Sequence, residues 1–331
     1  MKTKNDCLNV WKGIAAFAVV LIHCTLPGVP GEIIKGIARF AVPLFFLISG
    51  YFAYGREDAV LRRREIHILR LYVGAVVVYY LWAAIRYFLS QRTFAQMGAE
   101  LFPEGGRTVS DLLFFNRTAM APHLWFMGAL VYCYLFYRLL ARKRLEERTY
   151  LLIPVLLAAN LLLGEGRGLT GIAVPVRWIR SFWLTGFPFF LWGSWFACRE
   201  KQGRLQLHRG AGMALVAGGM LLSSVECLWS GYDELYVGSI LTAGGMFALA
   251  LAHPAFGKGS ALARIGERDS AQIYLWHMLL RNFAALAFMM VRFYETTICQ
   301  TLMPFLVGAA SIVLAEVINV FYNTRKSEAK R

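Results

Sequence analysis

The stretch NVWKGIAAFAVVLIHC, residues 9–24, forms most of the run 8–27, which is long and apolar enough to cross a lipid bilayer, yet it carries Lys12 and His23. A spanning helix needs about 20 mostly apolar residues. Titratable side chains are costly inside hydrocarbon and persist mainly where they line a cavity or meet a partner. This stretch therefore predicts a membrane helix that takes part in chemistry.

Similar apolar runs recur along the chain, and the composition agrees with a membrane protein. Charged residues make up 17% of the 331 residues, below the roughly 25% that is usual in soluble domains. No linker or internal repeat divides the sequence. We predict an all-α, polytopic integral membrane helix bundle that forms a single domain over 1–331. About ten transmembrane helices are expected, near 8–27, 34–54, 66–89, 122–141, 150–164, 182–198, 210–229, 235–253, 270–292 and 300–322.

The basic residues predict how these helices are oriented. Lys and Arg number 21 in the alternate segments that include both termini and 8 in the segments between them. Because basic residues collect on the cytoplasmic side, both termini are expected in the cytoplasm. We also expect a multi-pass protein of the cell (inner, cytoplasmic) membrane. The net charge of +15 falls in short clusters between apolar runs, which argues against a nucleic-acid partner. The two longest external segments, 90–121 and 165–181, either cap a cavity or merely connect helices.

Metal and cofactor chemistry has no support in the sequence. The six cysteines are scattered without the spacing of metal ligands. We expect no metal and no permanently bound cofactor, and the sequence does not indicate an oligomeric state.

Lys12 and His23 lie on one stripe of the first helix. They are eleven residues apart, which places them within roughly 20° of one face and roughly 16 Å apart along the axis. A cation near the cytoplasmic mouth and an imidazole deeper on the same stripe suit an anionic donor and a general base. A lysine that reaches toward the headgroups and a structural histidine are the alternatives.

The second helix brings Arg39 to the depth of His23, and its planar fork suits a carboxylate, a phosphate or a developing oxyanion.

Four segments in order resemble the membrane acyltransferase 3 family. They are the Lys12-to-His23 stripe, ARFAVPLFFLISGYF at 38–52, HLWFMGALVYCYLF at 123–136 and IYLWH at 273–277. The resemblance spans essentially the whole chain. The family usually has arginine at the position of Lys12 and an acidic residue at the position of Asn9, so the detail of donor binding differs here.

The resemblance implies a membrane O-acyltransferase that takes an acyl group, acetyl above all, from cytoplasmic acyl-CoA. The acceptor would be a hydroxyl of a glycan, a lipid-linked sugar or another cell-envelope molecule. His23 would act as general base or relay the acyl group, Arg39 would stabilise the oxyanion, and His123 would orient the acceptor or share proton transfer. Donor-binding roles are expected for Lys12, Arg64, Arg70 and His277.

Two parts of this assignment have open alternatives. His277 is expected in the cytoplasmic half of its helix, nearer Lys12 than His23, where it lines a donor channel or is merely structural. Arg64, His67 and Arg70, in RRREIHILR at 62–70, either meet a phosphorylated donor or anchor the cytoplasmic side.

A transporter of a small polar substrate such as an amino acid is the rival function. Buried titratable residues also suit a substrate pathway. The sequence shows no repeated halves with matching broken helices, which many transporters have.

Overall fold

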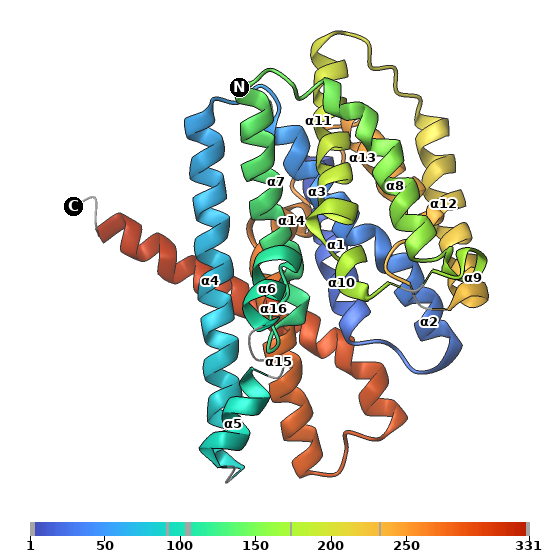
Figure 1. Cartoon of the computed structure of the whole chain (residues 1–331). Coiled ribbons are helices and arrows are strands. Elements are labelled where there is room, and N and C mark those ends of the chain that lie inside the picture. Colours follow the sequence, from blue (N-terminus) through green and yellow to red (C-terminus); the bar gives the residue numbers. More distant parts are fainter. Residues whose placement is uncertain (1–3, 91–92, 103–106, 173, 232, 329–331) are drawn as a thin grey trace. The chain divides into compact units, whose positions relative to one another are not determined.

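The computed structural model describes residues 4–90, 93–102, 107–172, 174–231 and 233–328, and every regular element in these ranges is helical (Figure 1). The α-helices are α1 (Asp6–His23), α2 (Gly28–Ile37), α3 (Ala41–Ala53), α4 (Asp58–Leu89), α5 (Phe94–Leu101), α6 (Arg107–Phe115), α7 (Trp125–Arg142), α8 (Leu152–Leu163), α9 (Arg167–Thr170), α10 (Val176–Ile179), α11 (Phe187–Lys201), α12 (Arg209–Ser230), α13 (Val237–Ala252), α14 (Ala261–Arg268), α15 (Ser270–Met290) and α16 (Thr297–Glu328). Tighter or wider turns are η1 (Ala38–Phe40), η2 (Pro122–Leu124), η3 (Arg148–Leu151) and the π-helical η4 (Phe182–Gly186).

The all-α prediction is confirmed for the described residues, and helices occupy all ten expected positions. Within the described ranges, seven helical segments are long and apolar enough to cross a membrane: Asp6–His23, Gly28–Ala53, Asp58–Leu89, Pro122–Arg142, Arg209–Ser230, Ser270–Met290 and Thr297–Phe321. Two further apolar helices are shorter, Arg148–Leu163 and Val237–Ala252. The count of ten spans and the cytoplasmic termini stay predictions.

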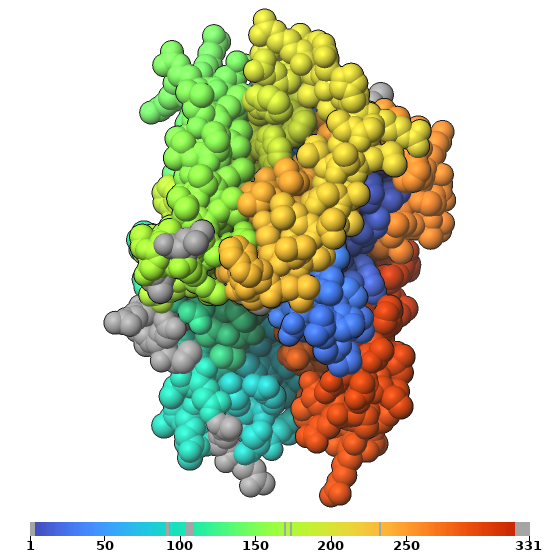
Figure 2. Space-filling model, turned by 90° about the vertical axis from the view of Figure 1, so that its right-hand side faces the viewer, coloured from blue at the N-terminus to red at the C-terminus, as the bar shows by residue number. Residues whose placement is uncertain are grey.

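The chain divides into two compact units, and the prediction of a single domain remains untested. Unit 1 comprises Met1–Phe45 and Gln206–Arg331, and unit 2 comprises Phe46–Leu205. In unit 1, α12 packs against α13 and α2, and α2 is exposed on the face shown in Figure 2. In unit 2, α4 packs against α7, while η4 contacts α7, α8 and α11.

One hydrophobic cluster in unit 1 joins α1, α15 and α16. Its buried side chains are Ala16, Val20, Cys24, Ile273, Cys299, Met303 and Val307. Ile273 lies on the face of α15 that meets α1. Side chains four residues apart share a helix face, so the next turn of α15 also faces α1.

Close backbone contact fixes α14 against the first half of α1. A Cβ on Gly266 would overlap the carbonyl group of Asn9, and a Cβ on Gly13 would lie 2.6 Å from the carbonyl oxygen of Leu262. Glycine allows two helices to approach this closely because it has no side chain. The crossing therefore fixes where α15, which follows α14, starts along α1.

The expected second helix, 34–54, is interrupted at the residue of interest. The structure has α2, the turn η1 and then α3, with Arg39 in the middle of η1. Pro43 is the third residue of α3. Its ring lacks an N–H and clashes with the carbonyl four residues earlier, which belongs to Arg39. The chain therefore leaves the regular helix at Arg39 and resumes it where proline is tolerated.

Candidate functional site

His23 and His277 are in contact in unit 1. Their ring centroids lie 5.2 Å apart with the planes tilted by 38°. His23 is the last residue of α1 and is half-buried, whereas His277 on α15 is fully buried. The structure thus brings together two residues that the sequence places 254 positions apart.

The packing of α1 against α15 explains this contact. Ile273 packs in the cluster that contains Ala16 and Val20. His277 lies one turn beyond Ile273, and His23 lies about one turn beyond Val20. The two histidines reach the same level because α1 and α15 run in the same direction from the α14 crossing. The expectation that His277 lies nearer Lys12 is wrong, since Lys12 is roughly 16 Å down α1 from His23.

Backbone carbonyls orient the ring of His277. Its Nδ1 lies 2.9 Å from the carbonyl oxygen of Tyr274 and 3.1 Å from that of Ile273. A carbonyl oxygen only accepts, so we assign the proton to Nδ1, and Nε2 is then an acceptor in the neutral ring. The imidazole is held in one orientation beside His23.

Arg39 forms a buried ion pair that the sequence reading did not include. Its Nη2 donates to Oε1 of Glu234 at 3.0 Å, and the two side chains are 7% and 10% exposed. Both residues belong to unit 1, in which η1 packs against α1. The pairing places a fixed carboxylate beside the guanidinium that was expected to stabilise an oxyanion.

Glu234 lies in the short connection between α12 and α13. The hydroxyl of Tyr236 donates to the Gly231 carbonyl at 2.7 Å and accepts from the Asp233 N–H at 2.8 Å, which fixes the turn. Glu234 lies between the expected helices 210–229 and 235–253 and was not predicted as a site residue. The predicted topology puts this connection on the external side, which is also the side at which Arg39 enters the membrane. A search of the external connections for acidic residues would therefore have included Glu234.

Lys12 lies on α1 and is half-buried. Within the described part of the chain it makes no hydrogen bond or ion pair. The nearby carboxylate of Glu267 instead accepts from Nζ of Lys4 at 2.6 Å. This hydrogen bond raises the pKa of Lys4 above its ordinary value. Lys12 therefore remains available to bind an anion.

The remaining candidates belong to unit 2. His123, in η2, is buried with its ring 4.9 Å from that of Tyr79 in an edge-on contact. Arg64 donates from Nη1 to the carbonyl oxygen of Phe52 at 2.9 Å, so it satisfies a carbonyl at the end of α3. His67 and Arg70 are exposed on α4. Arg64 thus has a structural contact, and Arg70 is available to solvent or headgroups.

The described residues contain no group of three or more His, Cys, Asp or Glu side chains placed to hold a metal ion. All six cysteines are free and buried. Unit 1 contains a pair of imidazoles, a buried guanidinium paired with a carboxylate, and a lysine near the start of α1. These groups can move protons and stabilise negative charge.

Comparison with known proteins identifies the family. A family model described as an acyltransferase domain, that of the acyltransferase 3 family, matches residues 5–321, nearly the whole chain. No curated protein and no solved structure gave a significant match. Together with its apolar helices, this match shows a membrane protein with the acyltransferase domain expected from its motifs. The chain belongs to the acyltransferase 3 family.

Proposed function

We propose that the protein is a membrane O-acyltransferase that moves an acyl group, acetyl above all, from acyl-CoA to a hydroxyl. The acceptor is a glycan, a lipid-linked sugar or another cell-envelope molecule, and the protein lies in the cell membrane with the donor bound from the cytoplasm. The contact between His23 and His277 carries this proposal, because it places a held imidazole beside a half-exposed one.

In this mechanism His23 accepts the proton of the acceptor hydroxyl as its oxygen attacks the thioester carbonyl. The carbonyl oxygen becomes negatively charged in the tetrahedral intermediate, and the guanidinium of Arg39 stabilises it. When the C–S bond breaks, the CoA thiolate leaves and takes up the proton from His23. The products are an ester and free CoA, and no redox partner is needed.

The other residues have supporting roles in the proposal. Glu234 holds the guanidinium of Arg39 in place, and His277 positions the ring of His23 instead of binding the donor. In unit 1, Lys12 binds a phosphate of the donor. In unit 2, Arg64 and Arg70 keep the donor-binding roles expected from the resemblance, and His123 orients the acceptor. Lysine binds phosphate as a point charge without the two-pronged geometry of arginine.

Donor turnover by purified protein in nanodiscs tests this function. Acetyl-CoA is supplied with candidate acceptors, and free CoA and acylated product are measured for wild type, His23→Ala and Arg39→Ala. The control is His208→Ala, which removes an exposed imidazole outside the proposed site. We expect turnover in wild type and the control, and loss in both site variants with unchanged helicity.

The rival function predicts another result. A transporter reconstituted in vesicles would move a small polar substrate with no acyl donor present. Failure of the wild type to bind any acyl-CoA would contradict the acyltransferase proposal.

A further inference from the structure

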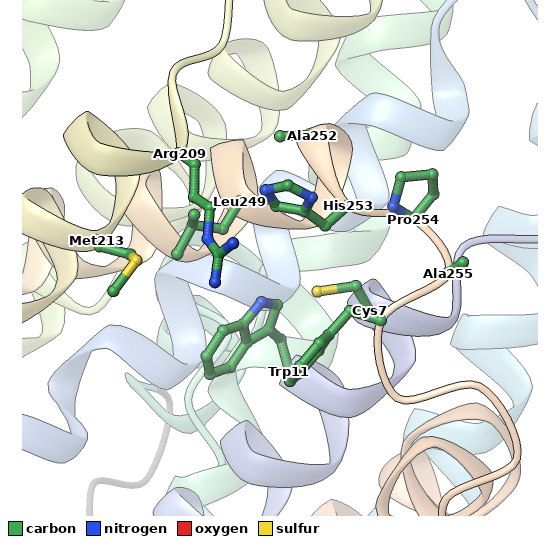
Figure 3. Close-up of a pocket in the computed structure, with 10 residues that line it drawn as sticks. Cys7, Trp11, Arg209, Met213, Leu249, Ala252, His253, Pro254 and Ala255 are labelled. Atoms are coloured by element: carbon green, nitrogen blue, oxygen red, sulfur yellow. The ribbon is translucent and has the colours of Figure 1, made fainter.

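A cavity of about 610 Å³ lies within unit 1, away from the paired histidines. It is formed where α1 and α12 begin and α13 ends, together with the turn that follows α13 (Figure 3). Its lining includes Cys7, Trp11, Arg209, Met213, Leu249 and His253. Basic residues predict that this end of unit 1 faces the cytoplasm.

The cavity is separate from the proposed acyl-transfer site. Trp11 directly precedes Lys12, so its side chain points about 100° away from the stripe that carries Lys12 and His23. His23 is twelve residues further along α1, about 18 Å along the axis. A ligand in this cavity is therefore on another face of α1 from the catalytic stripe.

One permanent cation, Arg209, stands at a mostly apolar lining. Arg209 is exposed and forms no ion pair or hydrogen bond through its side chain within the described residues. Its guanidinium and the indole of Trp11 point into the same space, with His253 beside them (Figure 3). Arg209 is also the first residue of the 22-residue α12, where the helix dipole favours an anion. The lining suits a ligand with one anionic group and an apolar body.

The cavity lies beside a surface that is built to face lipid. Met213 lines it and is 53% exposed, and the same helix exposes Leu215, Leu221, Val225 and Leu228. The apolar span of α12 begins at Arg209, so the guanidinium stands at the level of the phosphates of one leaflet. A soluble polyphosphate would need several cations in place of Met213, Leu249 and Phe256.

We propose that this cavity binds one anionic phospholipid of the leaflet on that side. Its phosphate lies between Arg209 and His253, and the start of an acyl chain packs on Met213 and Leu249. This binding does not depend on acyl transfer by the His23 site.

Binding of fluorescent, short-chain phosphatidylglycerol and phosphatidylcholine to delipidated protein in detergent tests the proposal. Wild type, Arg209→Gln, Met213→Trp and the control Arg204→Gln are compared. Arg204 is exposed in the connection between α11 and α12 and does not line the cavity. We expect Arg209→Gln to weaken phosphatidylglycerol binding about tenfold, as for a lost charged hydrogen bond. Phosphatidylcholine binding should weaken less, because its choline cation offsets the charge of its phosphate. Met213→Trp, which fills the mouth, should weaken both, and Arg204→Gln neither.

Three results would overturn the proposal. They are equal affinity of wild type for the two lipids, unchanged phosphatidylglycerol binding in Arg209→Gln, and displacement of bound lipid by CoA or ADP, which would identify a nucleotide site.

Discussion

Arg39 in unit 1 and Arg138 in unit 2 are both buried arginines beside carboxylates, but their surroundings differ. Arg39 donates from Nη2 to the carboxylate of Glu234, itself nearly buried. Arg138 donates from Nε and Nη2 to both oxygens of Asp58, at 2.8 and 2.9 Å, and from Nη1 to Glu65 at 2.6 Å. Asp58 is partly exposed and is shared with Arg142.

The different surroundings indicate that Arg138 stabilises the fold and that Arg39 takes part in the reaction. All three donor nitrogens of Arg138 are occupied by carboxylates that tie α4 to α7, which is an arrangement for holding helices. Arg39 lies in the turn η1, which interrupts a helix, and pairs with Glu234 from the connection between α12 and α13. It belongs to the unit that holds the paired histidines. We therefore expect changes around Arg138 to lower stability, and changes around Arg39 to lower turnover by folded protein.

The largest loss of stability is expected from a change at the crossing of α1 and α14 in unit 1. Gly266→Ala should destabilise the protein by at least about 3 kcal/mol, the upper end for overpacking, because the new methyl overlaps the Asn9 backbone. Thermal unfolding in detergent measures it. Gly74→Ala is the matched control, since a Cβ there meets open space and alanine favours a helix. Equal melting temperatures for the two variants would show that α1 and α14 do not cross as described.

Arg138→Gln should cost about 3 kcal/mol of stability, because it leaves Glu65 without its cation and leaves Asp58 with Arg142 alone. The same unfolding assay measures this loss. Donor turnover per folded molecule should stay at the wild-type level, and a fall in that ratio would place Arg138 in the chemistry.

Glu234→Gln should lower donor turnover per folded molecule by about 10- to 100-fold, which corresponds to about 1.4–2.8 kcal/mol. Glutamine keeps an acceptor oxygen for Arg39 but loses the charge that orients the guanidinium. Turnover equal to wild type would reduce the pair to a structural contact and remove the contrast with Arg138.

Arg142→Gln should have the smallest effect, below about 1 kcal/mol. Its side chain is 57% exposed and shares Asp58 with Arg138, and exposed ion pairs contribute little. A loss as large as that of Arg138→Gln would mean that the four charges act as one network.

The ten expected helical positions were predictable from the sequence because each has its own apolar run. The short helices α5, α6, α9, α10 and α14 lie outside those runs and were not predicted. The break at Arg39 was not predicted, since one helix was expected over 34–54. The turn falls four residues before Pro43 because that is where the proline ring clashes. The contact of His277 with His23 depends on the height at which α15 starts. That height is set by Gly13 and Gly266 rather than by hydropathy.

Glu234 was missed for a related reason. It lies in a connection, where acidic residues are common, and only its pairing with Arg39 gives it a role. His123 was placed on its element correctly, at the start of the fourth expected helix, and its catalytic role stays a prediction.

The pH dependence of donor turnover in wild type and His23→Ala tests the central claim most directly. If His23 is the general base, wild-type turnover rises over the pH range in which histidines titrate, and the variant loses at least about 100-fold in rate together with that rise. A variant that keeps the wild-type rate and the same rising limb would contradict the assignment of His23.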